Sequence, residues 1–188
     1  EMLSPGTYSL DHYREANRIM EDYQDLLEKS RAIYEALPEE YRAAFYQLVL
    51  SPVEFCSNLN EMYVAAGKNQ AYAKKGRTVA NDYADQVVRT FNKDEELTRY
   101  FHEELADGKW NHMMSQTHIG YQSWNNPPAN MMPGVSYVHA PQAHKIEFAI
   151  ERGASNEWQQ KQAGGFPAWQ QRFAPFDPIN DQSFYINI

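Results

Sequence analysis

The sequence predicts a mainly α protein: an antiparallel bundle of about four long helices, then an irregular segment rich in proline and aromatic residues, then a few β-strands. Apolar residues recur at alternating spacings of three and four over the first hundred positions, the period of an amphipathic helix. Beyond about residue 124 this period stops, and proline and glycine dipeptides appear. We therefore expect a helical bundle domain at residues 1–124 and a linker with a partial β-region at residues 125–188.

The first helix is predicted at residues 10–36. Ser9 precedes it as a good N-cap, because a serine hydroxyl can accept a hydrogen bond from an N–H of the first turn. One face of this helix is lined by Ala16, Met20, Tyr23, Leu27, Ser30, Tyr34 and Leu37, of which Ser30 alone is polar. At about 1.5 Å per residue this helix would be roughly 40 Å long, a length that suits a member of a bundle.

The second helix is predicted to begin at Pro38, because proline is favoured in a first turn and the acidic Glu39 and Glu40 follow it. Pro52 should kink this helix near Ser51, because its ring clashes with a preceding carbonyl and it has no N–H. The run Lys74-Lys75-Gly76 marks its end.

A third helix is predicted from about Thr78 to Asn92, and a fourth, capped by Asn92 or Asp94, to Ala106. Asp107-Gly108 would close the fourth helix with a C-terminal glycine. Short connections between four helices indicate antiparallel neighbours.

Residues 125–128 and 133–134 have the composition of turns, and residues 145–151 and 184–188 are predicted strands. Two strands alone are marginal in water. We therefore expect these strands to belong to a sheet completed by other sequence, and the chain to be a piece of a larger protein.

Composition narrows the classes of function. The chain has 188 residues and a formal net charge of −8, without a basic cluster, so we expect neither nucleic acid nor an anionic membrane surface as a partner. It contains no apolar run of about 18 residues that would span a membrane, and its first residues lack the pattern of a signal peptide. The single Cys56 excludes an intramolecular disulfide.

The most informative stretch is residues 108–124, which we call the closing segment. It combines large aromatic residues with imidazole and amide side chains and contains one charged residue, Lys109. Buried polar groups need partners, so this segment is either a polar-aromatic plug that joins parts of the fold or the wall of a carbohydrate site. The candidate substrate-binding residues are Trp110, His112, His118 and Trp124.

Other constellations carry weaker signals. Glu54, Asn58 and Glu61 share one helix face, and paired carboxylates can serve as acid and base in glycoside hydrolysis. We expect instead that these carboxylates pair with Arg77 or with lysines, or cap neighbouring segments. The six-residue spacing of His112 and His118 matches no familiar metal-ligand pattern, so we expect no metal and no cofactor.

A family resemblance adds to this interpretation. Residues 109–121, reading Lys-Trp-Asn-His-Met-Met-Ser-Gln-Thr-His-Ile-Gly-Tyr, resemble the segment that closes the helical domain of glycoside hydrolase family 115, the xylan α-glucuronidases. The resemblance continues in residues 41–63, in Gly76-Arg77 and in residues 80–84, and it covers about residues 1–135. The stretch from Val135 to Trp169 departs from the family, which leaves the junction with a following domain open.

The resemblance implies that the helical bundle follows a catalytic barrel and precedes a C-terminal β-sandwich. Such enzymes remove glucuronic acid or its 4-O-methyl ether from the α-1,2 branches of xylan, with inversion. The resemblance places their catalytic residues in the barrel, so no catalytic residue is carried over to this chain.

We therefore expect an accessory, inter-domain region of a secreted or periplasmic α-glucuronidase, not catalytic by itself. Its partners would be the barrel, the sandwich and, through the whole enzyme, glucuronoxylan; the chain could also form a homodimer. The alternative is a non-catalytic carbohydrate-binding or interaction module that uses exposed aromatic residues.

Overall fold

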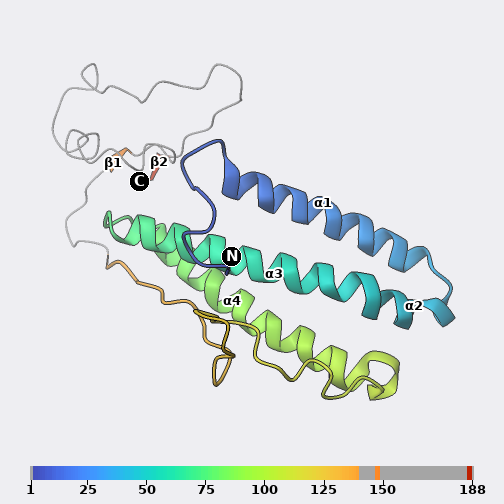
Figure 1. The fold of residues 1–188 in the computed structure, drawn as a ribbon. Coiled ribbons are helices and arrows are strands. Elements are labelled where there is room, and N and C mark those ends of the chain that lie inside the picture. The colour runs from blue at the N-terminus through green and yellow to red at the C-terminus, as the bar shows by residue number, and fades with distance from the viewer. Residues whose placement is uncertain (1, 140–146, 149–185, 188) are drawn as a thin grey trace.

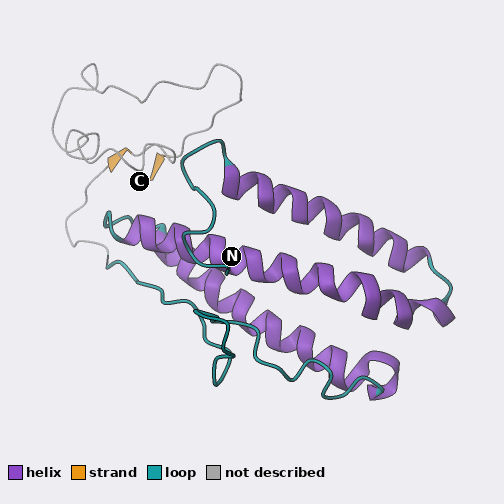
Figure 2. Cartoon of the chain, in the orientation of Figure 1, coloured by secondary structure: helices purple, strands orange, loops and turns teal. Residues whose placement is uncertain are grey.

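The computed structural model describes residues 2–139, 147–148 and 186–187. As predicted, the fold is mainly helical (Figures 1 and 2). The long helices of this described part are α1 (Glu15–Ala36), α3 (Ser51–Ala73) and α4 (Ala80–Arg99). They run antiparallel to one another in chain order, with α3 packed against both α1 and α4 (Figure 1).

Helix α1 begins at Glu15, five residues later than predicted. Ser9 caps a separate turn, because its Oγ accepts a hydrogen bond from the N–H of His12 at 2.9 Å. Tyr13 and Arg14 then have φ values of 55° and 52°, which no right-handed helix can contain. The carboxylate of Glu15 accepts a hydrogen bond from the N–H of Ser9 at 2.7 Å, so the turn and the helix start are fastened together.

The helix predicted after Pro38 is present and consists of three consecutive elements. Helix α2 (Glu39–Phe45) passes into a π-helical turn, η1 (Tyr46–Leu50), and then into α3. The N–H of Ser51 donates to the carbonyl of Tyr46, five residues earlier. This wider turn lies directly before Pro52, where a proline ring would otherwise clash with the preceding turn. Helix α3 ends before Gly76, which has a φ of 67°.

The predicted boundary at Asn92 or Asp94 is wrong, because α4 passes through both residues without a break. The expected third and fourth helices are thus one helix, and the described part of the chain has three long helices instead of four. Helix α4 continues into a π-helical turn, η2 (Tyr100–Glu104), and a 3₁₀ turn, η3 (Leu105–Gly108). The right-handed helix ends before Gly108, because Ala106 and Asp107 already have φ values of 48° and 55°. Gly108, the expected C-terminal glycine, follows them with a φ of 75°.

The core consists of two clusters of buried side chains. The first cluster joins the middle of α3 to α4 and includes Met62, Ala66, Val87 and, from the closing segment, Ile119. The second lies toward the α1–α2 connection and contains Leu27, Tyr46, Leu50, Phe101 and Leu105. Residues 109–138 follow these helices as an extended loop (Figure 2).

Two short strands, β1 (Glu147–Phe148) and β2 (Ile186–Asn187), pair antiparallel, with Glu147 opposite Asn187. They fall inside the two predicted strand segments, and the rest of those segments lies outside the described residues. In the described part of the chain, no helix combines the length and the apolar character needed to cross a bilayer.

Candidate functional site

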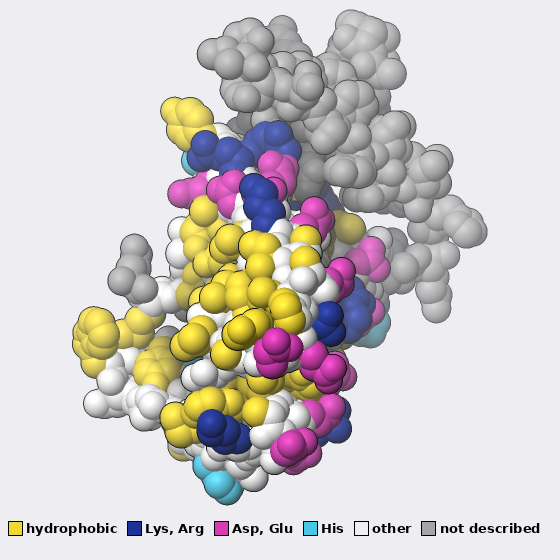
Figure 3. All heavy atoms as spheres, turned by 90° about the vertical axis from the view of Figure 1, so that its right-hand side faces the viewer, with side chains coloured by type: hydrophobic (Ala, Val, Ile, Leu, Met, Phe, Trp, Pro, Cys, Tyr) yellow, Lys and Arg dark blue, Asp and Glu magenta, His cyan; other side chains and the backbone are white. Residues whose placement is uncertain are grey.

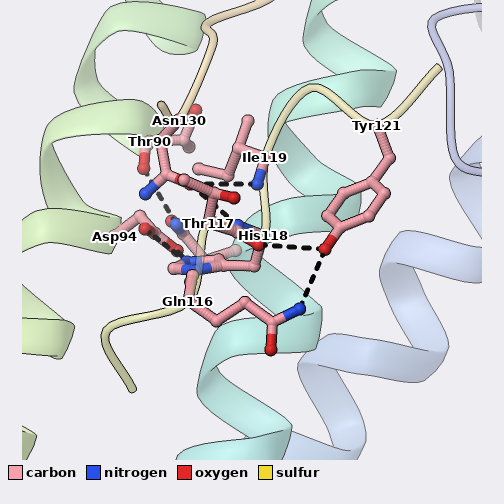
Figure 4. Close-up of polar contacts among 9 residues, drawn as sticks. Thr90, Asp94, Gln116, Thr117, His118, Ile119, Tyr121 and Asn130 are labelled. Atoms are coloured by element: carbon pink, nitrogen blue, oxygen red, sulfur yellow. Dashed lines mark hydrogen bonds and ion pairs between the residues drawn. The ribbon is translucent and has the colours of Figure 1, made fainter. Parts of the chain in front are cut away.

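The closing segment is attached to α4 through an ion pair between His118 and Asp94 (Figure 4). His118 Nε2 lies 2.8 Å from Oδ2 and 3.0 Å from Oδ1 of Asp94, whose carboxylate is buried. His118 Nδ1 lies 3.0 Å from the carbonyl oxygen of Gln116. The edge of the imidazole also packs against Phe55 of α3, with 6.0 Å between the ring centroids.

These contacts favour the charged imidazolium. Both partners of the ring, a carboxylate and a backbone carbonyl, can only accept hydrogen bonds, so both ring nitrogens must donate. The hydrogen bond to Asp94 raises the pKa of His118 above its ordinary value, burial partly opposes this rise, and the carbonyl of Gln116 adds to it. The site is therefore a structural charge pair on a half-buried surface.

Asn130 fixes the backbone next to this pair. Its Oδ1 accepts hydrogen bonds from the N–H groups of His118 and Ile119, at 2.8 and 3.1 Å (Figure 4). Gly120 has a φ of 94°, and a Cβ atom there would lie 2.7 Å from the Cβ of Met131. Only glycine fits where the backbone at residue 120 passes close to Met131. This close approach and the hydrogen bonds of Asn130 hold Ile119 in position, with its side chain in the core.

Two asparagines hold the end of the loop, residues 135–138, which we call the strap. Asn69 of α3 accepts from the N–H of Ser136 at 2.9 Å and donates to its carbonyl at 2.9 Å. Asn81 of α4 makes the same two bonds to Val138, at 2.7 and 3.0 Å. Each carboxamide thus bonds to both the N–H and the carbonyl of one residue, as a neighbouring β-strand would, and the two residues bound, Ser136 and Val138, are alternate positions of the extended backbone. Between them, Tyr137 points away and donates to Asp85 at 2.8 Å.

Trp110 and His112 lie at the other end of the closing segment. Trp110 is half-buried against the second core cluster, with the Lys109 ammonium 5.1 Å from its ring centroid. His112 is exposed, has a φ of 67°, and its ring lies 6.4 Å from that of His102. His102 Nε2 accepts a hydrogen bond from the N–H of Met114 at 3.0 Å, which fastens this end of the segment to η2.

Trp124 has a different environment, because 93% of its surface is exposed. The nearby Tyr121 hydroxyl donates to Asn126 Oδ1 at 2.6 Å, and Gln116 donates to that same hydroxyl at 3.2 Å. The polar groups of this loop thus pair with one another. The four candidates Trp110, His112, His118 and Trp124 occupy separate surroundings and do not converge on one cleft.

The carboxylates of α3 have structural partners. Glu54 is 8% exposed; its Oε1 lies 2.8 Å from Nη2 of Arg31, and its Oε2 accepts from the Tyr46 hydroxyl at 3.0 Å. Burial, and the charge and hydrogen bond of Glu54, raise the pKa of Tyr46. Glu61 instead accepts from Gln86 at 2.8 Å. The expected pairing with Arg77 or lysines is corrected to Arg31 for Glu54 and to an amide for Glu61.

Asn58, the middle residue of that predicted face, is buried and donates to the carbonyl of Thr90 at 2.8 Å. Glu54 faces the second core cluster, whereas Glu61 faces a groove between α1 and α4. The three side chains therefore do not form an acid–base pair around one space. Within the described residues, no group of three or more His, Cys, Asp or Glu side chains is arranged to hold a metal ion.

Sequence reasoning missed the residues that anchor the loop: Asp94, Asn130, Asn69 and Asn81. One signal for Asp94 was available. Ala80, Ala84 and Val87 repeat at helical spacing, and continuing that stripe by seven residues from Val87 reaches Asp94. A carboxylate on a buried stripe requires a partner, and His118 is the one it has.

Comparison of the sequence with known proteins gave no matching family model and no matching curated relative.

Proposed function

We propose that this chain is the accessory, inter-domain helical region of a secreted or periplasmic xylan α-1,2-glucuronidase, with catalysis in a barrel domain. The enzyme would remove (4-O-methyl)glucuronic acid from glucuronoxylan, and the strands β1 and β2 would belong to a following β-sandwich. The activity in this proposal comes from the resemblance to family 115, which residues 41–63, 76–77, 80–84 and 109–121 carry. One structural observation supports the role as a seam between domains.

That observation is an apolar surface at the end of the bundle near the α1–α2 connection. Its members, which we call the end patch, are Ile33, Tyr41, Leu48 and Val49, and Leu48 is 68% exposed. Figure 3 shows hydrophobic side chains gathered on this end. Contiguous exposed apolar surface is characteristic of an interface, because leaving it in water is unfavourable.

The paired polar groups support the same role. Glu54 and His118 each have a short ionic contact, and Asn69 and Asn81 are used on the strap. Such groups stabilise a fold and its attachment to neighbours.

The proposal is tested by uronic acid release from glucuronoxylan. The chain alone, the barrel domain of the parent enzyme alone and the two joined are compared at equal concentration. We expect release only where the barrel is present, and a more stable barrel in the joined protein. Release by the chain alone would place the chemistry in these residues, and a barrel unaffected by the chain would end the accessory role.

The exposed Trp124 favours a second candidate, a carbohydrate-binding module, because a flat apolar ring in water can stack on a sugar. Titrating the chain with glucuronoxylan fragments while following tryptophan fluorescence separates the two functions. A saturable change that disappears in Trp124→Ala supports the module. A spectrum that does not respond favours the seam.

A further inference from the structure

Helix α3 is covered on most of its circumference. Helices α1 and α4 pack on two sides, Pro5 of the N-terminal segment approaches Gly67, and Ile119 of the closing segment joins the core between α3 and α4. In the part of the chain that the structure describes, a groove of about 630 Å³ is lined by α1, the middle of α3 and the beginning of α4. This groove is separate from the end patch and does not depend on the proposed function.

The shape of the groove suits a helix. Its α1 wall is a single stripe of side chains at helical spacing: Asn17, Met20, Glu21, Gln24, Asp25 and Glu28. From Asn17 to Glu28 this stripe is about 17 Å long, enough for three helical turns. The floor contains Val64 and Ala65 of α3, which are buried, so the accessible apolar surface comes from the half-buried Met20 of α1 and Tyr83 of α4. A groove between two helices on the back of a third is where a bundle takes its fourth helix.

The acidic side chains that line the groove favour a positively charged partner. Glu21, Asp25, Glu28 and Glu61 line it, against one cation, Lys68. Arg14 neutralises Glu21 and Lys29 neutralises Asp25. Among the described residues, the printed partners of Glu28 and Glu61 are the amides of Gln24 and Gln86, which leave the two negative charges uncompensated.

Lys68 does not cancel these charges. Its ammonium donates to Asn17 at 3.4 Å and lies 5.3 Å from the ring centroid of Tyr83, and it makes no ion pair with either carboxylate. An anionic ligand such as a uronate would meet repulsion here. A second copy of the chain, with a formal net charge of −8, would add negative charge and is also disfavoured.

We propose that this groove is a docking site for an amphipathic helix of a partner protein or domain, with its apolar side chains against Met20 and Tyr83 and Lys or Arg side chains beside Glu28 and Glu61. The docked helix completes a four-helix arrangement around α3.

The test uses the full chain, labelled with ¹⁵N, and two synthetic helical peptides. One peptide has a leucine and alanine stripe flanked by lysines, and its twin has glutamates in place of the lysines. We expect the lysine peptide to bind saturably and to shift the resonances of Lys68, Gln86 and their neighbours. The glutamate peptide should leave these resonances unchanged.

A matched pair of variants separates the groove from general charge attraction. Glu28→Lys reverses a charge on the groove wall, and Asp22→Lys reverses one on the same helix at a position that does not line the groove. Both side chains are exposed, so both variants should fold. We expect Glu28→Lys to lower the affinity for the lysine peptide by roughly tenfold. Asp22→Lys should lower this affinity far less.

Four results would overturn the proposal. Two concern the lysine peptide: absence of saturable binding, and shifts confined to the end patch. The others are an equal loss of affinity in the two variants and binding of the glutamate peptide at the same site.

Discussion

His118 joins the closing segment to α4 through a contact with Asp94 that depends on the charge of its imidazole. Its pKa is raised above 6.5, chiefly by the hydrogen bond to Asp94, so the charged form is favoured in the folded chain. The stabilisation is fully present below the pKa of the unfolded chain, and it is lost as the pH rises through the folded pKa.

We therefore predict that the closing segment loosens as the pH rises from 6 toward 8. Thermal unfolding and amide exchange of Ile119 are measured across this range for the unchanged chain and for His118→Gln. The unchanged chain should lose stability with rising pH relative to the variant. The exposed His12→Gln serves as the control and should follow the unchanged chain. Identical pH profiles for the chain and His118→Gln would contradict the prediction.

Glu54 shows what residue spacing can and cannot establish. Its helical register with Asn58 and Glu61 was readable from sequence, but its partners were not. Arg31 lies 23 positions earlier on a different helix, and Tyr46 reaches Glu54 from the π-helical turn. A carboxylate in such contacts is buried because it is paired, so its burial indicates structure rather than catalysis.

Among the elements, the strap is held by the carboxamides of Asn69 and Asn81, and its Val135 packs against the first core cluster. We predict that Asn81→Ala accelerates exchange of the Val138 amide by roughly tenfold or more, because the N–H loses its acceptor and the carbonyl its donor. Hydrogen exchange followed by NMR measures this. Gln70→Ala is the control, since Gln70 makes one exposed, 3.3 Å bond to Gly134.

The helical stability should change little in Asn81→Ala, because the bonds lost belong to the strap. Unaltered exchange at Val138, or equal acceleration in Gln70→Ala, would show that the strap is held by other contacts.

The elements also show where local signals suffice. Pro38 and Gly76 marked real boundaries, because their effects on backbone dihedrals are local. Asn92 and Asp94 led to a wrong helix boundary, because the preference of these residues for helix caps competes with tertiary contacts. Asp94 instead forms an ion pair with His118, 24 residues away. The strap bonds span 57 and 67 residues, so no local pattern could predict them.

Across the whole molecule, apolar and acidic surfaces are separated. The end patch lies near the α1–α2 connection, and the acidic groove lies along α1 between Asn17 and Glu28. The overall class and the helical bundle were predictable from apolar periodicity, which depends on burial alone. The two surfaces were not, because each is assembled from more than one helix.

The end patch should make the isolated chain associate with itself. Leu48 and Tyr41 are mostly exposed, so the double variant Leu48→Lys with Tyr41→Lys removes apolar surface at a cost of only about 0.5 kcal/mol per site. We predict that sedimentation shows concentration-dependent association for the unchanged chain and a monomer for this variant, with little change in melting temperature.

Tyr13→Lys with Trp124→Lys is the matched control, because it adds the same two charges at apolar side chains outside the end patch that are even more exposed. If the control also becomes monomeric, added charge and not the end patch governs association. If the unchanged chain is a monomer at every concentration, the patch does not join copies. Association that only the Leu48 and Tyr41 variant abolishes identifies the end of the bundle as the sticky surface, where a neighbouring domain would bind.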